Sequence, residues 1–283
     1  MEKLLFKTHS NRFSPKRKKR FREDLKIELE KLGYHVVIDK KLFSSNIYFG
    51  NPKAKYALTA HYDTATNMAV VYPFMKYFGA RYGQLLILIP VIITFFFFPE
   101  YYLPIFGLFA LVLFIGLLIP NKYNYNDNSS GVYTVLKHAK NNQGNNDFFY
   151  ALTDNEEKGL FGARALRTYL KEVKCLKKIR IINIDCVGTG DMFAITSTSN
   201  NNFLNNAYIK CSSYRDILKI DSKLLSSDHA LFGKRGIMIT KVNRSKFLGD
   251  VYIPNLHTNK DNVIDYRNID ETLLYIKKIT EEA

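Results

Sequence analysis

The sequence predicts an α/β fold, a three-layer sandwich in which helices flank a mixed, largely parallel sheet. The first observation is that short apolar, β-rich runs alternate with stretches of helical spacing along most of the chain. The second is that acids and histidines follow several of these runs, at the strand ends where open α/β folds carry functional groups. The third is an apolar stretch at residues 83–120, which predicts an inserted transmembrane helical hairpin.

The predicted strands and helices alternate from the amino to the carboxyl end. Strands are expected at residues 34–38, 47–49, 55–60, 147–152, 178–184 and 236–242. Helices are expected at residues 20–32, 130–140, 160–171, 203–211, 227–234 and 270–281. Gly33 marks the end of the first helix, because glycine readily adopts the backbone conformation that follows a helix.

Residues 83–120 form the predicted hairpin. Two apolar runs, 85–98 and 103–119, are separated by a turn-like segment, and Glu100 is the only charged residue between them or within them. A helix that crosses a bilayer core needs roughly 17 to 25 apolar residues, which the second run supplies and the first supplies only with help from residues 82–84. The alternative is a buried hairpin or an apolar cap over a soluble domain, but four consecutive phenylalanines leave no hydrophilic face for water.

The charges around the hairpin predict its orientation. Lys76, Arg81 and Lys122 flank its base, whereas Glu100 lies at the turn. By the positive-inside rule, both ends of the hairpin and the remaining chain face the cytoplasm, so the prediction is an integral membrane protein with two helices. Three cysteines without paired spacing agree with a reducing compartment, and the amino terminus lacks the apolar core of a secretory signal.

A basic run occupies the amino terminus of a chain whose formal net charge is +15. Between residues 1 and 20, eight lysines and arginines face only Glu2. Such a run can bind nucleic acid, contact an anionic membrane or remain solvated. The hairpin favours contact with anionic lipid headgroups, worth about 1 kcal/mol per well-placed cation, and disfavours nucleic acid as a partner. The predicted organisation is a basic segment (1–20), a domain made of 21–82 and 121–283, and an inserted hairpin (83–120).

Acids and histidines at the predicted strand ends form a candidate metal site. They are His61, Asp63, Asp127, Glu156, Glu157, Asp185 and His257. Two imidazoles with three or more carboxylates suit zinc, and cobalt or manganese are possible substitutes. Each motif alone is weak, because an H-x-D pair is often structural and a strand-end aspartate often caps a helix. Their joint occurrence at strand ends favours a metal site.

These motifs together resemble the two-zinc aminopeptidases of peptidase family M28, which includes bacterial leucyl aminopeptidases. The matching segments are AHYD, DNSSGV, NEEKGLFGA, INID, SSDHALFGKRGI and HTNKDN, and they span residues 58–262. The resemblance implies a zinc-dependent exopeptidase that hydrolyses N-terminal residues from peptide substrates. It also implies two Zn²⁺ per chain, for which Co²⁺ or Mn²⁺ can substitute.

The resemblance implies a ligand set for the two ions. One zinc is expected to be held by His61, Asp127 and Asp185. The other is expected to be held by Asp127, Glu157 and His257, so that Asp127 bridges the pair. The peptide bond that follows Asp127 lies at the position where this family has a cis peptide.

The resemblance also implies roles beside the metal ions. Glu156 is expected to be the general base that activates a metal-bridging water, and Asp63 to orient the imidazole of His61. His229 lies in a segment that the family places near the substrate pocket, although a structural role is an equal alternative. Tyr252 is a candidate for an oxyanion contact close to the metal site.

Two other interpretations of the same residues remain open. One keeps the fold but makes the protein a single-zinc glutaminyl cyclase-like enzyme or another amide hydrolase, against which the full five-ligand set argues. The other is a catalytically inactive membrane receptor or scaffold, against which the presence of every ligand and of Glu156 argues. The leading prediction is a membrane-anchored dizinc aminopeptidase. Because the hairpin is inserted between His61 and Asp127, the rim of its active site is expected near the membrane.

Overall fold

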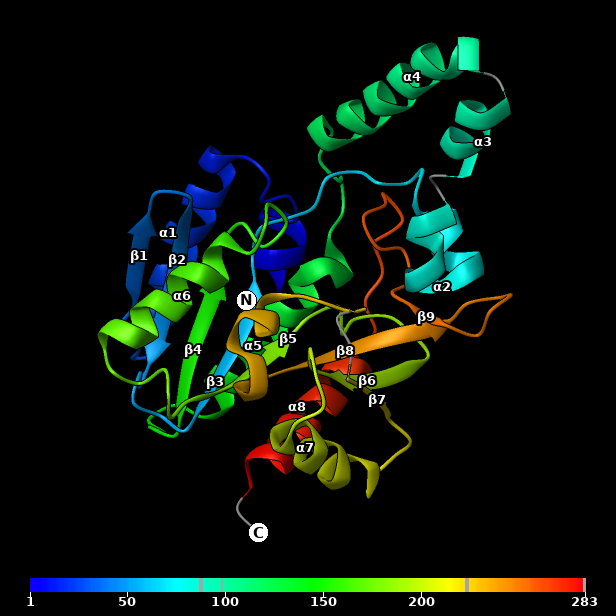
Figure 1. Cartoon of the computed structure of the whole chain (residues 1–283). Helices are drawn as coiled ribbons and strands as arrows, with labels where there is room; N and C mark the ends of the chain where they lie inside the picture. The colour runs from blue at the N-terminus through cyan, green and yellow to red at the C-terminus, as the bar shows by residue number, and fades with distance from the viewer. Residues whose placement is uncertain (87–88, 98, 222–223, 282–283) are drawn as a thin grey trace.

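A nine-stranded mixed sheet forms the centre of the molecule (Figure 1). The computed structural model describes residues 1–86, 89–97, 99–221 and 224–281. Along the sheet the strand order is β1-β2-β4-β3-β5-β8-β6-β7, and β9 pairs with β8 outside this row. The strands are β1 (Val37–Lys41), β2 (Ser44–Gly50), β3 (Tyr56–His61), β4 (Phe148–Thr153), β5 (Arg180–Ile184), β6 (Met192–Thr196), β7 (Leu218–Ile220), β8 (Gly236–Arg244) and β9 (Val251–Tyr252).

The four central strands, β4, β3, β5 and β8, run parallel. Antiparallel pairs β1–β2 and β2–β4 form one edge, and β6 is antiparallel to β8 but parallel to β7. Every residue of β3 and of β4 is buried, as expected for parallel strands that helices cover on both faces. The predicted three-layer α/β sandwich with a mixed, largely parallel sheet is confirmed in this central part.

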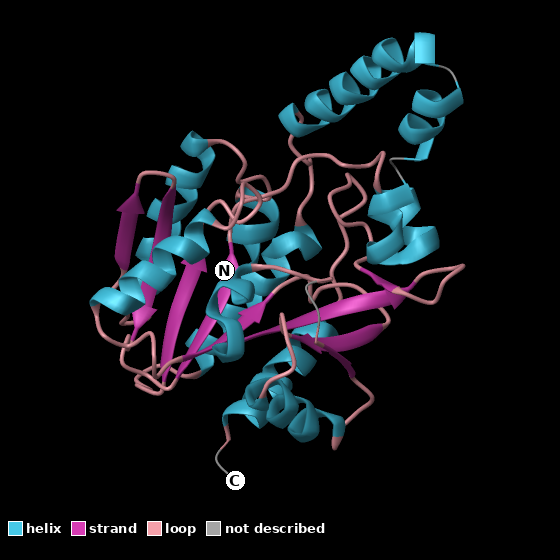
Figure 2. Cartoon of the chain, viewed as in Figure 1, coloured by secondary structure: helices cyan, strands magenta, loops and turns pink. Residues whose placement is uncertain are grey.

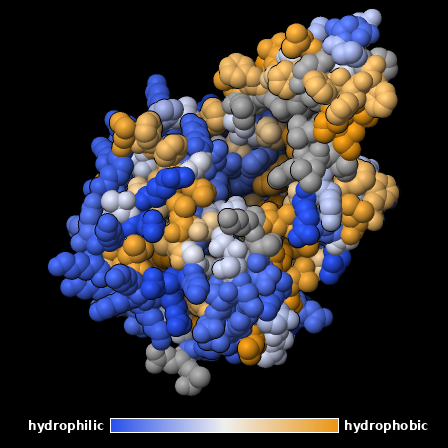
Figure 3. Space-filling model, in the orientation of Figure 1, coloured by the Kyte–Doolittle hydropathy of each residue, from blue (hydrophilic) through white to orange (hydrophobic). Residues whose placement is uncertain are grey.

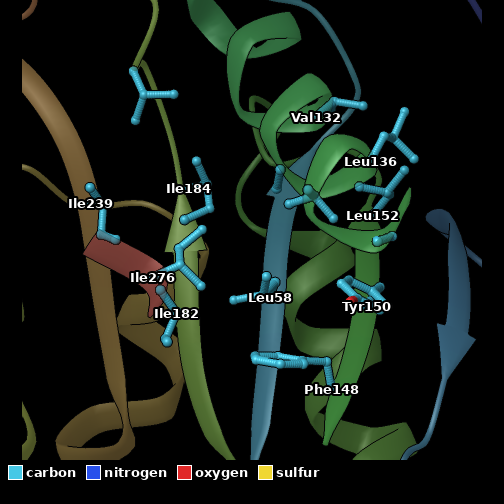
Figure 4. Close-up of a cluster of buried hydrophobic side chains, with 14 of the residues drawn as sticks. Leu58, Val132, Leu136, Phe148, Tyr150, Leu152, Ile182, Ile184, Ile239 and Ile276 are labelled. Carbon is cyan, nitrogen blue, oxygen red and sulfur yellow. The ribbon is translucent and has the colours of Figure 1, made fainter. Parts of the chain in front are cut away.

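Helices cover both faces of the sheet (Figure 2). They are α1 (Pro15–Lys31), α2 (Tyr72–Leu86), α3 (Ile89–Phe97), α4 (Pro99–Leu118), α5 (Gly131–Asn141), α6 (Phe161–Glu172), α7 (Asn202–Ser212) and α8 (Tyr266–Thr280). Helices α1, α5, α7 and α8 contribute to the largest buried cluster, whereas α6 packs on the opposite face with alternate residues of the same strands. Figure 4 shows part of the larger cluster, where Leu58, Tyr150 and Ile182 from three adjacent strands lie below Val132 and Leu136 of α5.

Most predicted elements are present, with shifted ends. Helix α1 begins at Pro15 rather than at residue 20, because the side chain of Ser14 accepts a hydrogen bond from the N–H of Arg17 (3.4 Å) and proline is favourable in a first helical turn. The segment predicted as a helix at 227–234 is a 3₁₀-helix, Asp228–Arg235. Strands β6, β7 and β9 were not predicted.

Residues 1–20 pack against the rest of the domain, and the predicted boundary at residue 20 lies inside α1. Leu5 and Phe6 belong to the largest buried cluster. Arg12 and Lys18 are also buried, so the prediction that they contact lipid headgroups is wrong: their side chains are used inside the fold. The other six basic residues of the run are exposed, and lipid contact stays a prediction for them.

Helices α3 and α4 form an apolar arm that projects from the sheet domain (Figure 3, orange). In α4, the window Pro99–Gly116 is long and apolar enough to cross a membrane, and none of it is buried. Helix α3 has only nine residues, and residues 87–88 and 98 of the predicted first span lie outside the described residues. Within the described part of the chain there is therefore one candidate span, where the sequence predicted two.

The carboxyl end of the arm is fastened to the segment that precedes α2. Thr66 and Pro120 form an isolated antiparallel bridge, and the N–H of Asn67 donates to the carbonyl of Ile119 (2.8 Å). The chain therefore rejoins the domain beside residues 66–67, whereas the arm leaves after α2, which itself packs against β9.

Candidate metal centre

Three adjacent parallel strands deliver polar side chains to one edge of the sheet. His61 is the last residue of β3, Asp185 directly follows β5, and Glu156 and Glu157 lie in the loop after β4. The carboxyl ends of parallel strands meet at the same edge, which is where open α/β sheets bind ligands. The sheet therefore brings together residues that are far apart in the sequence.

Five of these side chains form two groups that share Asp127. In the first group, Nε2 of His61 lies 3.2 Å from Oδ1 of Asp127 and 3.6 Å from Oδ1 of Asp185. In the second, Nε2 of His257 lies 3.0 Å from Oδ2 of Asp127 and 3.2 Å from Oε2 of Glu157. Each group offers one imidazole nitrogen and two carboxylate oxygens that could hold a metal ion. The five predicted ligands are thus brought together, one oxygen of Asp127 in each group.

The spacing within these groups fits zinc. Tetrahedral zinc with bonds of about 2.0–2.1 Å separates neighbouring ligand atoms by about 3.3 Å. The separations between each imidazole nitrogen and its two carboxylate oxygens run from 3.0 to 3.6 Å in the structure. Oδ2 of Asp127 and Oδ1 of Asp185 are buried and have no hydrogen-bond partner in the described ranges, an arrangement that a bound cation would satisfy. Imidazole with carboxylate is also a ligand set that zinc accepts.

The electrostatics of the two groups also favour positive charge between the acids. Burial opposes a charge on His61, but Asp185 and Asp127 outweigh it and raise the pKa of the imidazole well above its usual value. Burial likewise opposes a charge on His257, whose pKa Glu157 and Asp127 raise. The acids therefore stabilise protons on both imidazoles, and a metal cation would replace those protons, since metal ligands must be deprotonated.

Asp63 connects the β3 end to the glutamate loop. Its two carboxylate oxygens accept hydrogen bonds from the backbone N–H groups of Glu156 (3.1 Å) and Glu157 (3.3 Å). Its Oδ1 lies 3.5 Å from Nδ1 of His61, which is long for a hydrogen bond but places the carboxylate behind the imidazole. Asp63 is thus positioned to orient both His61 and the two glutamates.

Glu156 lies at the cluster without belonging to either of the two groups that share Asp127. One of its carboxylate oxygens falls within 4.8 Å of ligand atoms of His61 and Glu157. Burial raises the pKa of Glu156 well above its usual value, and the charge of neighbouring Glu157 raises it further. A carboxylate with a raised pKa is suited to accept a proton near neutral pH.

The loop that carries Asp127 is fixed by a buried network. Asp261 accepts hydrogen bonds from the N–H groups of Asn126 (2.7 Å) and Asp127 (3.0 Å). The side-chain amide of Asn128 donates to the carbonyl of Ile184 (2.9 Å), the residue before Asp185, and the Asp127–Asn128 peptide is cis, as predicted. Sequence analysis gave Asp261 no role, although it closes the H-T-x-x-D part of the last motif.

Residues 118–279, more than half of the chain, match the model of peptidase family M28. The chain belongs to peptidase family M28. The membership predicted from the motifs is therefore confirmed, and peptides are the substrate class that the family implies.

Solved structures of similar fold accompany this match. The LapA aminopeptidase of Legionella pneumophila is 12% identical, with 98% of this chain and 69% of that chain covered and a TM-score of 0.66. A glutaminyl cyclase of Tannerella forsythia is 14% identical, with 99% and 96% covered and a TM-score of 0.64. BSAP, a zinc aminopeptidase of Bacillus subtilis, is 17% identical, with 83% and 48% covered and a TM-score of 0.51. No curated protein matches the chain.

At these identities the similar structures show the fold alone. The chain also spans only about half the length of BSAP. The match to a peptidase family supports the predicted zinc-dependent exopeptidase.

Arg12 lies behind the ligand loops of this M28 peptidase. Its Nε donates to the carbonyl of Tyr62 (2.5 Å), Nη1 to the carbonyl of His9 (2.5 Å) and Nη2 to Oγ of Ser129 (2.9 Å). Burial lowers the pKa of the guanidinium to about 10, which leaves it charged at neutral pH, and Asp63 opposes that shift. One buried cation therefore ties the loop after His61 to the loop after Asp127.

Lys18 fixes the glutamate loop from the same side. Its Nζ donates to Oδ1 of Asp154 and to Oδ1 of Asn155, both at 2.6 Å. The other oxygen of Asp154 accepts from the N–H of Ser45 (3.0 Å). Asn155 directly precedes Glu156, so α1 supports the loop that carries the proposed base. Neither Arg12 nor Lys18 was predicted at the site, because a basic run does not show which cations will be buried.

The two predicted substrate residues lie in different surroundings. His229 is fully buried in the 3₁₀-helix beside Asp228; burial lowers its pKa to about 4, and neither ring nitrogen has a hydrogen-bond partner within the described part of the chain. Tyr252 lies in β9 opposite Asn243, with its ring 6.3 Å from that of Tyr72. The oxyanion contact of Tyr252 and the substrate contact of His229 both stay predictions.

Proposed function

We propose that this M28 peptidase is a dizinc aminopeptidase that removes N-terminal residues from peptides. The observation that carries the proposal is the position of Asp127, whose two oxygens lie 3.2 Å from Nε2 of His61 and 3.0 Å from Nε2 of His257. A carboxylate that supplies one oxygen to each of two imidazole-containing groups is what a two-metal site requires. His61 and Asp185 complete one position, and Glu157 and His257 complete the other.

Bound zinc supplies a Lewis acid that polarises the scissile carbonyl and lowers the pKa of water. The residues of the chain handle the proton. Glu156 accepts it from the attacking water and returns it to the leaving amine as the C–N bond breaks, which leaves a free amino acid and a shortened peptide. Asp63 holds the Glu156 backbone in place, and the raised pKa that burial gives Glu156 suits this exchange.

The first test uses metal-reconstituted protein and a panel of aminoacyl amides. Hydrolysis is expected for free α-amines and not for N-acetylated versions of the same amides. Glu156→Gln is expected to keep the zinc content of the wild type and to lose hydrolysis, because the amide cannot accept the proton. Unchanged turnover in Glu156→Gln would overturn the role of this residue, and cleavage of acetylated amides would overturn exopeptidase action.

A glutaminyl cyclase-like reaction is the second candidate. The observation that favours it is that 96% of the Tannerella forsythia cyclase is covered, against 69% of LapA. The presence of both ligand groups favours two ions over one. Metal content per chain and the released product separate the two reactions, because cyclisation of an N-terminal glutamine releases ammonia and aminopeptidase action releases an amino acid.

The apolar arm is proposed to anchor the enzyme in a bilayer. Leu103 is 74% exposed and Phe97 is 73% exposed, and an apolar surface of this extent is unfavourable in water. Lys76, Arg81 and Lys122 at the base of the arm favour a cytoplasmic peptidase domain, formed by the chain on either side of the insertion. Replacing residues 83–120 by a short linker is expected to give a protein that no longer fractionates with membranes. Retention in a carbonate-resistant membrane fraction would refute the anchor.

A further inference from the structure

We propose that the β8–β9 loop and helix α2 form a second membrane contact, which lies on an anionic lipid surface at the base of the apolar arm. Five residues define this interfacial patch: Lys76, Tyr77, Lys246, Phe247 and Leu248. The proposal rests on the arm being the membrane anchor, because the arm determines which side of the domain faces the lipid. It assigns a lipid contact to residues that are remote from the metal centre.

The loop exposes large apolar side chains at its tip. Phe247 is 61% exposed and Leu248 is 53% exposed, and Gly249 follows them in a left-handed conformation (φ 65°). A surface turn of this kind needs no apolar side chains for its own folding, since Val242 and Val251 already form a buried cluster beneath it with Ala80 of α2. The exposed pair therefore points to a partner that is itself apolar at its surface.

The loop is held firmly against α2. The N–H of Phe247 donates to the carbonyl of Tyr77 (2.9 Å), and the N–H of Lys246 donates to the carbonyl of Lys76 (3.2 Å). The rings of Tyr77 and Phe247 stack with centroids 5.4 Å apart and an interplanar angle of 21°, and Phe78 contacts Phe247 at 5.5 Å. The patch is thus a fixed surface formed by two segments, rather than a loose loop.

The charges of the patch select the kind of surface. Nζ of Lys246 lies 5.8 Å from the ring centroid of Tyr77 and 5.9 Å from that of Phe247, and Lys76 is exposed beside them. Neither lysine forms an ion pair with any residue that the structure describes. Asp250, in the same loop, does not neutralise either lysine; its carboxylate accepts a hydrogen bond from the backbone N–H of Arg81 (3.1 Å). Aromatic rings beside unpaired lysines are typical of the interfacial layer, where the rings enter the headgroup region and the amines meet anionic lipids.

The patch lies on the helix that leads into the arm. Helix α2 leads along the chain toward α3, and Figure 1 shows the β8–β9 loop beside α2, with the arm extending beyond it. A hairpin alone would let the peptidase domain swivel about its two connections. A second contact beside α2 would fix the tilt of the domain, and with it the direction in which the metal centre faces the lipid.

The test uses the full chain, whose lack of tryptophan makes a single introduced tryptophan an unambiguous probe. Phe247→Trp is reconstituted in vesicles that contain anionic phosphatidylglycerol and brominated phosphatidylcholine, which quenches tryptophan at the depth of the bromines. Emission is expected to shift to the blue and to be quenched. The matched control is Tyr214→Trp, which replaces a 55% exposed ring just after α7, distant from the arm, and is expected to stay unquenched.

Two further variants separate the patch from the anchor. Phe96→Trp reports on the arm, where the native ring is 70% exposed. Quenching of Phe96→Trp without quenching of Phe247→Trp would overturn the patch and leave the anchor intact. Absence of quenching in Phe96→Trp would refute the anchor, and with it the orientation on which the patch rests. Adding Lys76→Glu and Lys246→Glu to Phe247→Trp is expected to abolish its quenching without lowering zinc content. Quenching that survives this charge reversal, or is the same in neutral vesicles, would refute recognition of anionic lipid.

Discussion

Arg12→Met is the substitution that most directly tests how the amino terminus supports the metal centre. The side chain is fully buried and donates to the carbonyls of Tyr62 and His9 and to the hydroxyl of Ser129. Its guanidinium also lies 5.2 Å from the ring of Phe21 in α1. Methionine fills similar space but provides no donor, so the three acceptors stay in the interior without their partner.

The magnitude follows from these contacts. A buried acceptor left without its donor costs about 1–3 kcal/mol, so the two backbone carbonyls alone predict a loss of about 2–6 kcal/mol in the free energy of unfolding. This is a large part of the roughly 5–15 kcal/mol that stabilises a typical domain. Because Arg12 bridges the loops after His61 and Asp127, zinc is also expected to dissociate more readily from the variant. Arg12→Lys keeps the charge but cannot reach three separated acceptors, and an intermediate loss is expected.

The assay is urea unfolding in detergent, followed by circular dichroism, together with zinc content after dialysis. The matched control is Arg17→Met, since Arg17 belongs to the same basic run but is exposed, and a change within about 0.5 kcal/mol is expected there. If Arg12→Met unfolds at the same urea concentration as Arg17→Met and keeps its zinc, Arg12 stabilises neither the fold nor the metal centre, and this prediction is refuted.

Two other predictions concern the ligands and the pH dependence of stability. His257→Ala is expected to lower zinc content from two ions per chain to one, whereas Asp127→Asn is expected to weaken both sites; equal losses in the two variants, measured by metal analysis, would contradict a shared Asp127. His138 is buried against the hydroxyl of Tyr150 (3.0 Å), and burial lowers its pKa from 6.5 to about 4. As the pH falls, His138 is protonated in the unfolded chain before it is protonated in the folded chain. Its contribution to the free energy of unfolding is therefore fully present above pH 6.5 and falls by about 3 kcal/mol as the pH drops to 4. His138→Gln should lack this part of the slope in urea titrations at several pH values.

The elements that sequence analysis found and missed differ in length and burial. Strands such as β4 (FFYALT) and β5 (RIINI) are mostly apolar segments of five or six residues, and all of their residues except Arg180 are buried, so a sequence pattern reveals them. By contrast, β7 has three residues, none of them buried, and β9 has two, which is too few for any periodicity. The start of α1 was missed because its first turn is polar, and only the hydrogen bond at Ser14 and the proline after it mark the beginning.

The residues of the metal site also fall into two groups, those that could be predicted from the sequence and those that could not. His61, Glu157 and Asp185 could be predicted because they lie at or just after the ends of parallel strands, which a sheet brings together whatever the sequence distance between them. Asp127 precedes α5 and His257 lies in the loop after β9, and these two ligands were predicted from the family resemblance of their motifs.

The supporting residues could not be predicted: Lys18 meets Asp154 across 136 positions and Arg12 meets Ser129 across 117. Contacts of this kind arise from how α1 packs on the finished domain, and nothing local in the basic run distinguishes these two cations from their exposed neighbours.

The arm interrupts the chain between His61 and Asp127, and its fastening explains why the centre tolerates it. The bridge between Thr66 and Pro120 fastens the carboxyl end of the arm to the segment before α2. In that segment, the N–H of Met68 donates to the carbonyl of His257 (2.7 Å), a residue held in a left-handed conformation (φ 54°) that non-glycine residues rarely adopt. The segment leading into α2 therefore helps to hold a proposed zinc ligand. The segment before α2 thus connects the proposed membrane anchor to the proposed zinc ligand His257 through one hydrogen bond.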